Sequence, residues 1–237
     1  MFRRLRANAV PGNEPVAVRI RPLGNEVVWC RPGTKDAVVL WATFHGRHHL
    51  PPGRLPRECV ILDLGANVGY TALHFAHLYP RARIVAVEMD GGNCLMASRN
   101  LERVKERCAV INVAIWSSDG EVRYAGPNEE SYRVVDRGEV GASAARTVPS
   151  RTVQTVLDEN RMEIVDYLKM DVEGAESEIL RGNIDWTRRV MSMKIEVHRP
   201  EELDPLSRVL SGAGYLCRRD ESHACCLYAA RRGWRSD

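Results

Sequence analysis

One short turn constrains the fold of this chain more than any other feature, the segment Asp63-Leu64-Gly65-Ala66-Asn67-Val68-Gly69. The apolar run Val60–Leu64 leads into it and predicts a buried strand, and Asn67–Tyr79 follows with apolar residues at helical spacing. Gly65 permits a backbone conformation that residues with a Cβ avoid, and lets the main chain approach a ligand closely. A strand, a glycine turn and a helix in this order are typical of doubly wound α/β folds, which bind nucleosides there.

The rest of the chain continues this alternation. Further strands are expected at 82–87, 109–116, 165–170 and 191–197, and helices at 95–104, 152–157, 175–180 and 202–210. Successive parallel strands require right-handed crossovers, so the prediction is one α/β domain with a mostly parallel, doubly wound, Rossmann-like sheet. Segments 215–219 and 224–230 are expected to pair as closing strands.

Two segments do not fit the alternation. Residues 1–58, with short strands expected at 16–20 and 26–30, are interpreted as an N-terminal extension that packs on a core domain of residues 59–237. Residues 117–150 are rich in Gly, Ser, Pro and charged residues, and only 121–124 suggests a strand. A connection this long inside a compact domain predicts a lid or a substrate loop.

Composition excludes several classes of protein. The net charge is only +3, which does not require a polyanionic partner. The sequence has no apolar run of 18 residues, so no membrane span is expected. Seven cysteines without a C-x-x-C pair suggest neither a disulfide framework nor a structural zinc site. Cys59, Cys225 and Cys226 lie in apolar runs and are expected to be buried thiols. The first residues lack the apolar region of a signal peptide, so a cytoplasmic location is expected. The basic ends are interpreted as solvated tails.

Glu88 adds to the nucleotide signal, because it ends the second strand, 19 residues after Gly69. A carboxylate there can accept hydrogen bonds from both hydroxyls of a ribose. The turn reads G-x-N-x-G rather than the dinucleotide fingerprint G-x-G-x-x-G. Asp63 beside it would repel a pyrophosphate and favour the cations of S-adenosylmethionine, whereas a dinucleotide and a purely structural turn remain alternatives.

Four stretches then resemble the FkbM-type methyltransferases: VILDLGANVGYTAL at 60–73, residues 87–90, NVAIWSSD at 112–119 and YLKMDVEGAESEIL at 167–180. The resemblance covers roughly residues 30–200, and the block DVEGAE at 171–176 is its most specific part. It implies a seven-stranded sheet with an antiparallel last strand, S-adenosylmethionine as cofactor, and mostly O-methylation of small molecules.

The resemblance also implies positions for the cofactor. Its methionine end would be lined by Asp63, Gly65, Ala66, Asn67 and Gly69, with Asp171 close by. Tyr70 and Thr71 would join Asn67 in donating to its carboxylate. The ribose would contact Glu88, and the adenine would lie by Met89, Val113 and Ala114. The usual proline after the acid is Met89 here, which puts the local turn in doubt.

Two dyads, Asp171-x-Glu173 and Glu196-x-His198, each follow an apolar strand. Residues i and i+2 of a strand face the same way, so each dyad is expected to project at the carboxyl edge of the sheet. One interpretation makes His198, or else a carboxylate, the general base for a substrate hydroxyl. A second makes Asp171, Glu173 and Glu196 ligands of a divalent ion, although no metal is expected.

A third interpretation is structural, with Glu173 and Glu176 in the first turn of a helix and Lys169 and Lys194 neutralising the acids. His45, His48 and His49 precede the proline-rich linker and are expected to be solvated loop residues, although a contact with the substrate is an alternative. His74 and His77 are expected to lie at the surface or at the boundary of the core.

The favoured function is O-methylation of a hydroxyl on a sugar, polyketide, peptide or lipid-linked small molecule, with no nucleic-acid partner. A nucleic-acid methyltransferase, a nicotinamide-dependent oxidoreductase and a non-catalytic scaffold remain alternatives. The sequence does not indicate the oligomeric state.

Overall fold

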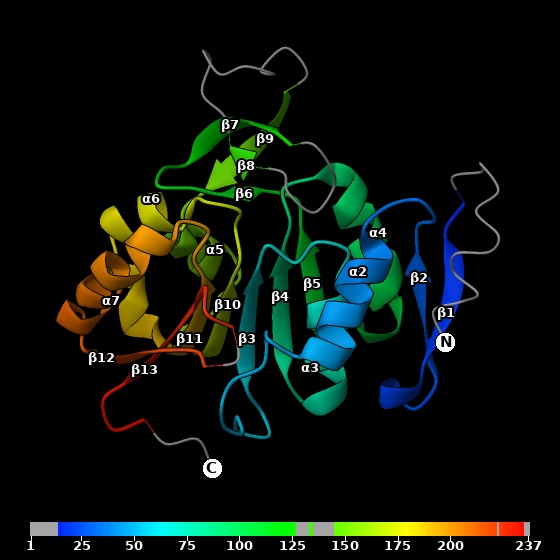
Figure 1. The fold of residues 1–237 in the computed structure, drawn as a ribbon, viewed down its shortest axis with the longest axis horizontal. Helices are drawn as coiled ribbons and strands as arrows, with labels where there is room; N and C mark the ends of the chain where they lie inside the picture. Colours follow the sequence, from blue (N-terminus) through cyan, green and yellow to red (C-terminus); the bar gives the residue numbers. More distant parts are fainter. Residues whose placement is uncertain (1–13, 127–132, 135–144, 222, 235–237) are drawn as a thin grey trace.

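In a computed structural model that describes residues 14–126, 133–134, 145–221 and 223–234, a seven-stranded sheet forms the centre of the molecule (Figure 1). The strand order is β12-β13-β11-β10-β3-β4-β5. Every pair from β11 to β5 is parallel, and β13 runs antiparallel to both of its neighbours. The bounds are β3 (Val60–Leu64), β4 (Arg83–Val87), β5 (Cys108–Ile111), β10 (Val165–Met170), β11 (Val190–Glu196), β12 (Tyr215–Arg219) and β13 (Cys226–Arg231). The predicted fold class, with its antiparallel last strand, is confirmed.

Helices cover both faces of this sheet (Figure 1). Side chains alternate along each strand, so Leu62 and Leu64 pack on one face and Ile61 on the other. The first face is covered by α5 (Val153–Glu159), α6 (Glu176–Arg181) and α7 (Leu203–Gly212), and the second by α3 (Tyr70–Leu78) and α4 (Gly91–Leu101). Among the described helices, none is both long enough and apolar enough to cross a bilayer.

Residues 14–58 pack on the second face through a hairpin and a helix. The hairpin pairs β1 (Val16–Ile20) with β2 (Glu26–Cys30), and α2 (Asp36–Trp41) continues into a π-helical turn, η2 (Ala42–Gly46). The phenol of Tyr70 donates to the carbonyl of Trp29 at 2.7 Å, and the amide nitrogen of Trp29 donates to Asn100 Oδ1 at 2.7 Å. These bonds tie the hairpin to α3 and α4. The expected division between residues 58 and 59 stays a prediction.

The strand expected at 109–116 is wrong as a single element. The chain leaves the main sheet after β5, and β6 (Ala114–Ile115) joins a second sheet of order β6-β9-β7-β8. The break falls at Asn112, whose Nδ2 donates at 2.9 Å to the carbonyl oxygens of both Glu88 and Met89. These side-chain bonds hold the chain across the end of β4, so the strand cannot continue in register.

The second sheet lies over the carboxyl ends of the main strands (Figure 1). It consists of β6 with β7 (Gly120–Ala125), β8 (Arg133–Val134) and β9 (Arg146–Arg151). The expected strand at 121–124 corresponds to β7, whereas β9 was not expected. Residues 127–132 and 135–144 of the predicted substrate loop lie outside the described residues. The described part shows that much of this connection is a sheet above the candidate site.

Candidate active site

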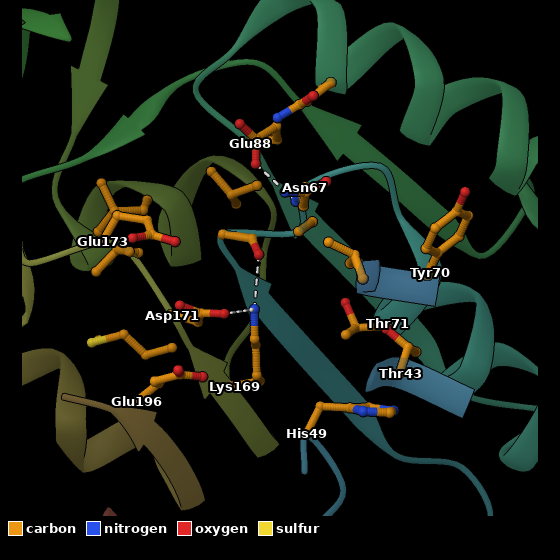
Figure 2. A pocket seen from close by; sticks show the side chains of 18 of the residues that line it. Thr43, His49, Asn67, Tyr70, Thr71, Glu88, Lys169, Asp171, Glu173 and Glu196 are labelled. Carbon is orange, nitrogen blue, oxygen red and sulfur yellow. Dashed lines mark hydrogen bonds and ion pairs between the residues drawn. The ribbon is translucent and has the colours of Figure 1, made fainter. Parts of the chain in front are cut away.

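A cavity of about 390 Å³ opens at the carboxyl ends of β3, β4, β10 and β11. We call the part lined by Gly65, Ala66, Asn67, Glu88, Met89 and Val113 the glycine-loop end, and the part lined by Asp171, Glu173, Lys194, Glu196, His223 and Cys226 the acidic end. Figure 2 shows Glu88 and Asn67 on one side of the cavity and Glu196 on the other, with Lys169 and Asp171 between them. A cavity of this volume is in the range of small-molecule sites.

The glycine-loop end depends on the backbone at Gly65. Its φ of +77° lies in the left-handed region, and a Cβ there would come within 1.7 Å of the carbonyl oxygen of Asp171. The amide nitrogens of Gly65 and Ala66 both donate to the carbonyl of Val87, at 3.0 and 2.9 Å. A residue with a side chain at 65 would therefore push apart the ends of β3 and β10.

Glu88 holds the opposite side of the same end. Its Oε2 accepts from the amide of Asn67 and its Oε1 from the amide of Asp90, both at 2.8 Å. Burial raises the pKa of Glu88 to about 7, although the two amide bonds lower it. Each carboxylate oxygen can accept more than one hydrogen bond, so Glu88 retains acceptor capacity toward the cavity that it lines.

A row of buried charges crosses the floor of the cavity. Asp63, Lys169 and Lys194 are register partners on β3, β10 and β11. Lys169 Nζ donates to the carbonyl of Gly65 at 2.8 Å and lies 3.5 Å from Asp63 Oδ1 and 3.3 Å from Asp171 Oδ2. Burial disfavours the ammonium, but Asp171 and Asp63 hold the pKa of Lys169 above its usual value. Lys169 thus links the glycine turn to the start of the acidic end.

Most of the residues that the sequence proposed for the cofactor line the cavity: Gly65, Ala66, Asn67, Tyr70, Thr71, Glu88, Met89, Val113 and Asp171. Their side-chain donors, however, are directed elsewhere. The phenol of Tyr70 donates to Trp29 and the hydroxyl of Thr71 to Asp63. The first amide groups of α3, by contrast, lack partners within the helix.

The other three proposed residues lie outside the cavity wall. Asp63 is fully buried behind the glycine turn, where Thr71 and Lys169 contact it. Gly69 faces α4, since a Cβ there would lie 3.0 Å from the Cα of Ala97. Ala114 packs in the small cluster under the second sheet, and Ile115 lines the cavity instead.

The two dyads meet at the acidic end, but not through strand alternation. Strand β10 ends at Met170, so Asp171 and Glu173 lie in the following turn, where Glu173 has a φ of +53°. Nε2 of His198 lies 3.3 Å from Glu173 Oε2 and 3.6 Å from Asp171 Oδ1. A non-glycine residue in the left-handed region stores strain, and such strain gathers at functional sites.

The electrostatics of this end favour proton transfer. Burial lowers the pKa of His198, but the hydrogen bond and charge of Glu176, with Asp171 and Glu173, raise it to about 9. Burial and then the charge of Asp171 raise the pKa of Glu173 to about 7, against the opposing effect of His198. At neutral pH His198 is therefore a cation beside a carboxyl group that is close to its midpoint of titration.

Glu176 fits the structural interpretation of the acids. Its Oε1 accepts from the amides of Val172 and Gly174, at 3.3 and 3.1 Å, and lies 3.0 Å from Nδ1 of His198. It therefore holds the turn and the imidazole together. Lys194 contacts Asp220 on the turn after β12, so Lys169 alone of the two lysines contacts a dyad residue in the described structure.

Of the three proposed metal ligands, Asp171 and Glu196 lie close together, whereas Glu173 is not in their group. One ligand atom from each of Asp171, Glu196 and His198 lies within 4.8 Å of the others, and Glu173 contacts His198 rather than completing an acidic triad. Glu176 also engages the imidazole of His198, with its Oε1 3.0 Å from Nδ1.

Several lining residues were missed or underestimated in the sequence. The π-helical turn after α2 presents Thr43 to the cavity, and His48 and His49 line it as well. His49 Nε2 lies 3.0 Å from His74 Nδ1, and both rings are buried, so the expectation that His74 lies at the surface or at the boundary of the core is wrong. The cluster of histidines at 45–49 was the available signal. Cys225 is only partly buried, unlike Cys59 and Cys226.

The profile of the methyltransferase FkbM domain matches residues 63–217. The chain is 27% identical to methyltransferase sdnD of Sordaria araneosa, over 79% of this chain and 85% of that protein. It is 25% identical to 2-O-methyltransferase NoeI of Sinorhizobium fredii, over 52% of this chain and 56% of that protein. It is also 26% identical to the AMB antimetabolite synthetase AmbE of Pseudomonas aeruginosa, over 76% of this chain but only 11% of AmbE.

Proposed function

The chain belongs to the FkbM family of S-adenosylmethionine-dependent methyltransferases, and on this premise we propose that it methylates a hydroxyl oxygen of a small molecule bound at the acidic end. One observation carries the proposal: the glycine-loop end and the acidic end are parts of one continuous cavity. Methyl transfer is an in-line displacement, so donor and acceptor must share one enclosed space.

The residues of the glycine-loop end fit the cofactor. Glu88 offers buried acceptor oxygens to the two ribose hydroxyls, and Met89, Val113 and Ile115 offer an apolar surface to the adenine. Asp171 lies where it can balance the ammonium of the methionine moiety. When bound, S-adenosylmethionine supplies an electrophilic methyl group on a sulfonium. Asp63 acts behind this wall, where it positions Lys169 and Thr71.

We assign the general base to Glu173 rather than to His198. Glu173 lines the cavity, and its pKa of about 7 matches a base that works near neutral pH. His198 keeps its proton at that pH because its pKa is raised to about 9, and it is therefore unsuited to accept another. The role of general base that the sequence suggested for His198 is therefore assigned to Glu173.

His198 then acts as a positioning cation. It lies between Glu173, Asp171 and Glu176, and its positive charge offsets the repulsion among these three carboxylates. Once Glu173 accepts the hydroxyl proton, the imidazolium still neutralises Asp171 and Glu176. Glu196 lines the cavity on the far side and, with Lys194, offers hydrogen-bonding groups to the acceptor.

A small hydroxylated acceptor fits the enclosed volume and the charge of the acidic end. The relative NoeI is named as a 2-O-methyltransferase, which agrees with an oxygen acceptor. A nucleic-acid acceptor is disfavoured, because Asp171, Glu173 and Glu196 would repel phosphates. All seven cysteines are unpaired, which supports a reducing, cytoplasmic setting.

The test is a screen of hydroxylated metabolites, including sugars, uronic acids and polyketides, with S-adenosylmethionine labelled in the methyl group. Label should pass to an oxygen of at least one acceptor class, and Glu173→Gln should abolish most of that transfer. Label that enters only nucleic acid, or only a nitrogen or carbon atom, would overturn the proposed acceptor chemistry.

A further inference from the structure

A second group of potential ligands converges at the acidic end, and two of its three members, His223 and Cys226, have no role in the methyl transfer proposed above. Glu196 ends β11 and Cys226 begins β13, and the two are register partners across the antiparallel pair. His223 lies in the turn just before β13. One ligand atom from each residue lies within 4.8 Å of the other two, and all three residues line the cavity.

The backbone fixes this arrangement. The amide of Cys226 donates to the carbonyl of His223 at 2.8 Å, and the amide of His223 donates to that of Asp220 at 3.3 Å. Nδ1 of His223 lies 3.0 Å from Sγ of Cys226, and Nε2 lies 3.9 Å from Oε1 of Glu196. The imidazole therefore sits between a thiol and a carboxylate, which lie on neighbouring strands.

His48 holds the imidazole from the opposite side. Its ring stacks on that of His223, with centroids 4.7 Å apart and an angle of 30° between the planes. His48 itself lines the cavity and comes from the segment after the π-helical turn. The candidate ligands are thus held by both the sheet and the N-terminal segment, as a preformed site requires.

We propose that Glu196, His223 and Cys226 bind one divalent transition-metal ion of the zinc type, with its open coordination position toward the cavity. One sulfur, one nitrogen and one oxygen ligand suit a borderline-soft ion, and three protein ligands with one open position are typical of catalytic zinc sites. Binding replaces the S–H bond of Cys226 with a sulfur–metal bond and releases that proton to solvent.

Nearby charges are compatible with such an ion. The thiolate of Cys226 and the carboxylate of Glu196 would supply two negative charges. Lys194, the neighbouring cation on β11, is paired with Asp220, and Lys169 is held by Asp63 and Asp171. Both lysines therefore pair with acids other than Glu196. His198, the other cation close to Glu196, is likewise paired with Asp171, Glu173 and Glu176.

This inference rests on the proposed function and deepens it. A hydroxyl of the acceptor at the open position would have its pKa lowered by the ion, and Glu173 would remove the proton more easily. The site would thus select acceptors whose hydroxyl can reach the open position of the ion.

The experiment uses the full chain after treatment with a chelator and titrates it with Co²⁺, a spectroscopic substitute for zinc. We expect one equivalent to bind per chain and to produce a thiolate-to-cobalt charge-transfer band in the near ultraviolet. Cys226→Ser should abolish the band. His223→Ala should weaken Co²⁺ binding more than about 100-fold, since even residues that only hydrogen-bond to a metal ligand are worth roughly 10- to 100-fold. Cys225→Ser is the matched control and should retain the band.

Thermal unfolding without metal should show that all three variants fold. Calorimetry with S-adenosylhomocysteine on the same samples separates the two proposals. Cofactor binding without a cobalt band, or a band that persists in Cys226→Ser, would overturn the metal site and leave the methyltransferase assignment intact. A band without any cofactor binding would support the metal site and contradict the proposed function.

Discussion

Nε2 of His198 lies 3.3 Å from Oε2 of Glu173, although the two residues follow different strands of the sheet. The contact places a cation against the carboxyl group that we assign as the base. Two effects follow from it: the negative form of Glu173 is stabilised, and the proton of His198 is retained. The catalytic assignment can therefore be tested from either residue.

Glu173→Gln keeps the size of the side chain and removes its ability to accept a proton. We expect the turnover number to fall roughly 100- to 10,000-fold, the usual contribution of general-base catalysis. The affinity for S-adenosylhomocysteine should stay within about threefold, because Glu173 lies at the acidic end. Glu178→Gln, on the exposed side of α6, is the matched control. Unchanged turnover in Glu173→Gln would place the base elsewhere.

The pH dependence of turnover should report the same pair. At saturating S-adenosylmethionine, the rate should rise with pH through about 7 as Glu173 loses its proton. It should fall as pH rises through about 9, where His198 becomes neutral. Glu173→Gln should lose the rising limb and keep the falling one. A profile that stays flat between these two values would contradict the assignment.

The same histidine should make stability depend on pH. The folded-state pKa of about 9 lies above the usual 6.5, so the stabilisation is complete below about pH 6.5 and is lost as pH rises through 9. Each pKa unit is worth about 1.4 kcal/mol, so the difference between 9 and 6.5 would correspond to roughly 3.5 kcal/mol. Because the His198 side chain is 27% exposed, solvent screening reduces the expected gain at pH 6 over His198→Gln to on the order of 2 kcal/mol. Urea unfolding of both chains at pH 6 and pH 10 measures the difference in their free energies of unfolding. If that difference were the same at both pH values, the raised pKa of His198 would be contradicted.

Glu88 should govern the affinity for the cofactor. Glu88→Gln keeps a side chain that can contact Asn67 but removes the charge. Charge-assisted hydrogen bonds are worth roughly 1.5–3 kcal/mol, so S-adenosylhomocysteine should bind about 10- to 100-fold more weakly by calorimetry. Glu163→Gln, at an exposed position before β10, is the control and should bind S-adenosylhomocysteine with the affinity of the native chain. Equal affinities for the two variants would remove Glu88 from the ribose site.

Gly65 should be irreplaceable for a steric reason. Gly65→Ala combines an unfavourable backbone conformation with a clash against the carbonyl of Asp171, and we expect a loss of roughly 2–5 kcal/mol in the free energy of unfolding. Gly174→Ala is the comparison, because Gly174 also has a positive φ but no atom within 4 Å of the added Cβ. It should lose only about 1–2 kcal/mol. Similar losses in both variants, measured by denaturant unfolding, would show that strain alone matters at residue 65.

The alternation of apolar strands and helices was sufficient to predict the layers of the fold. Strands β3 and β10 have the expected bounds, because buried parallel strands are short, continuous apolar runs. The break at Asn112 could not be read in this way, since two side-chain bonds to distant carbonyls cause it. Strand β9 was missed because its sequence, RTVPSR, mixes proline with arginine and pairs mainly with β7.

The geometry of the candidate site was predictable where it depends on the local backbone, and less so where it depends on packing between distant segments. The sequence indicated the glycine turn and Glu88 because they follow two neighbouring parallel strands, β3 and β4, whose ends lie side by side. Asp63 lies behind the cavity wall because Lys169, from another strand, contacts it there. His198 holds its proton because Glu176, from another segment, contacts its imidazole. Cys226 and His223 had no motif, since their proximity to Glu196 arises only from the register of β13 with β11.

Strand β13 follows β12 along the chain but lies between β12 and β11. A chain without residues 226–231 would therefore leave this edge of β11 unpaired, and an unpaired edge is a template for association with other strands. His223 and Cys226, the neighbours of Glu196, come from this same C-terminal segment. Truncation before His223 would thus spare the residues of the glycine turn and remove part of the acidic end.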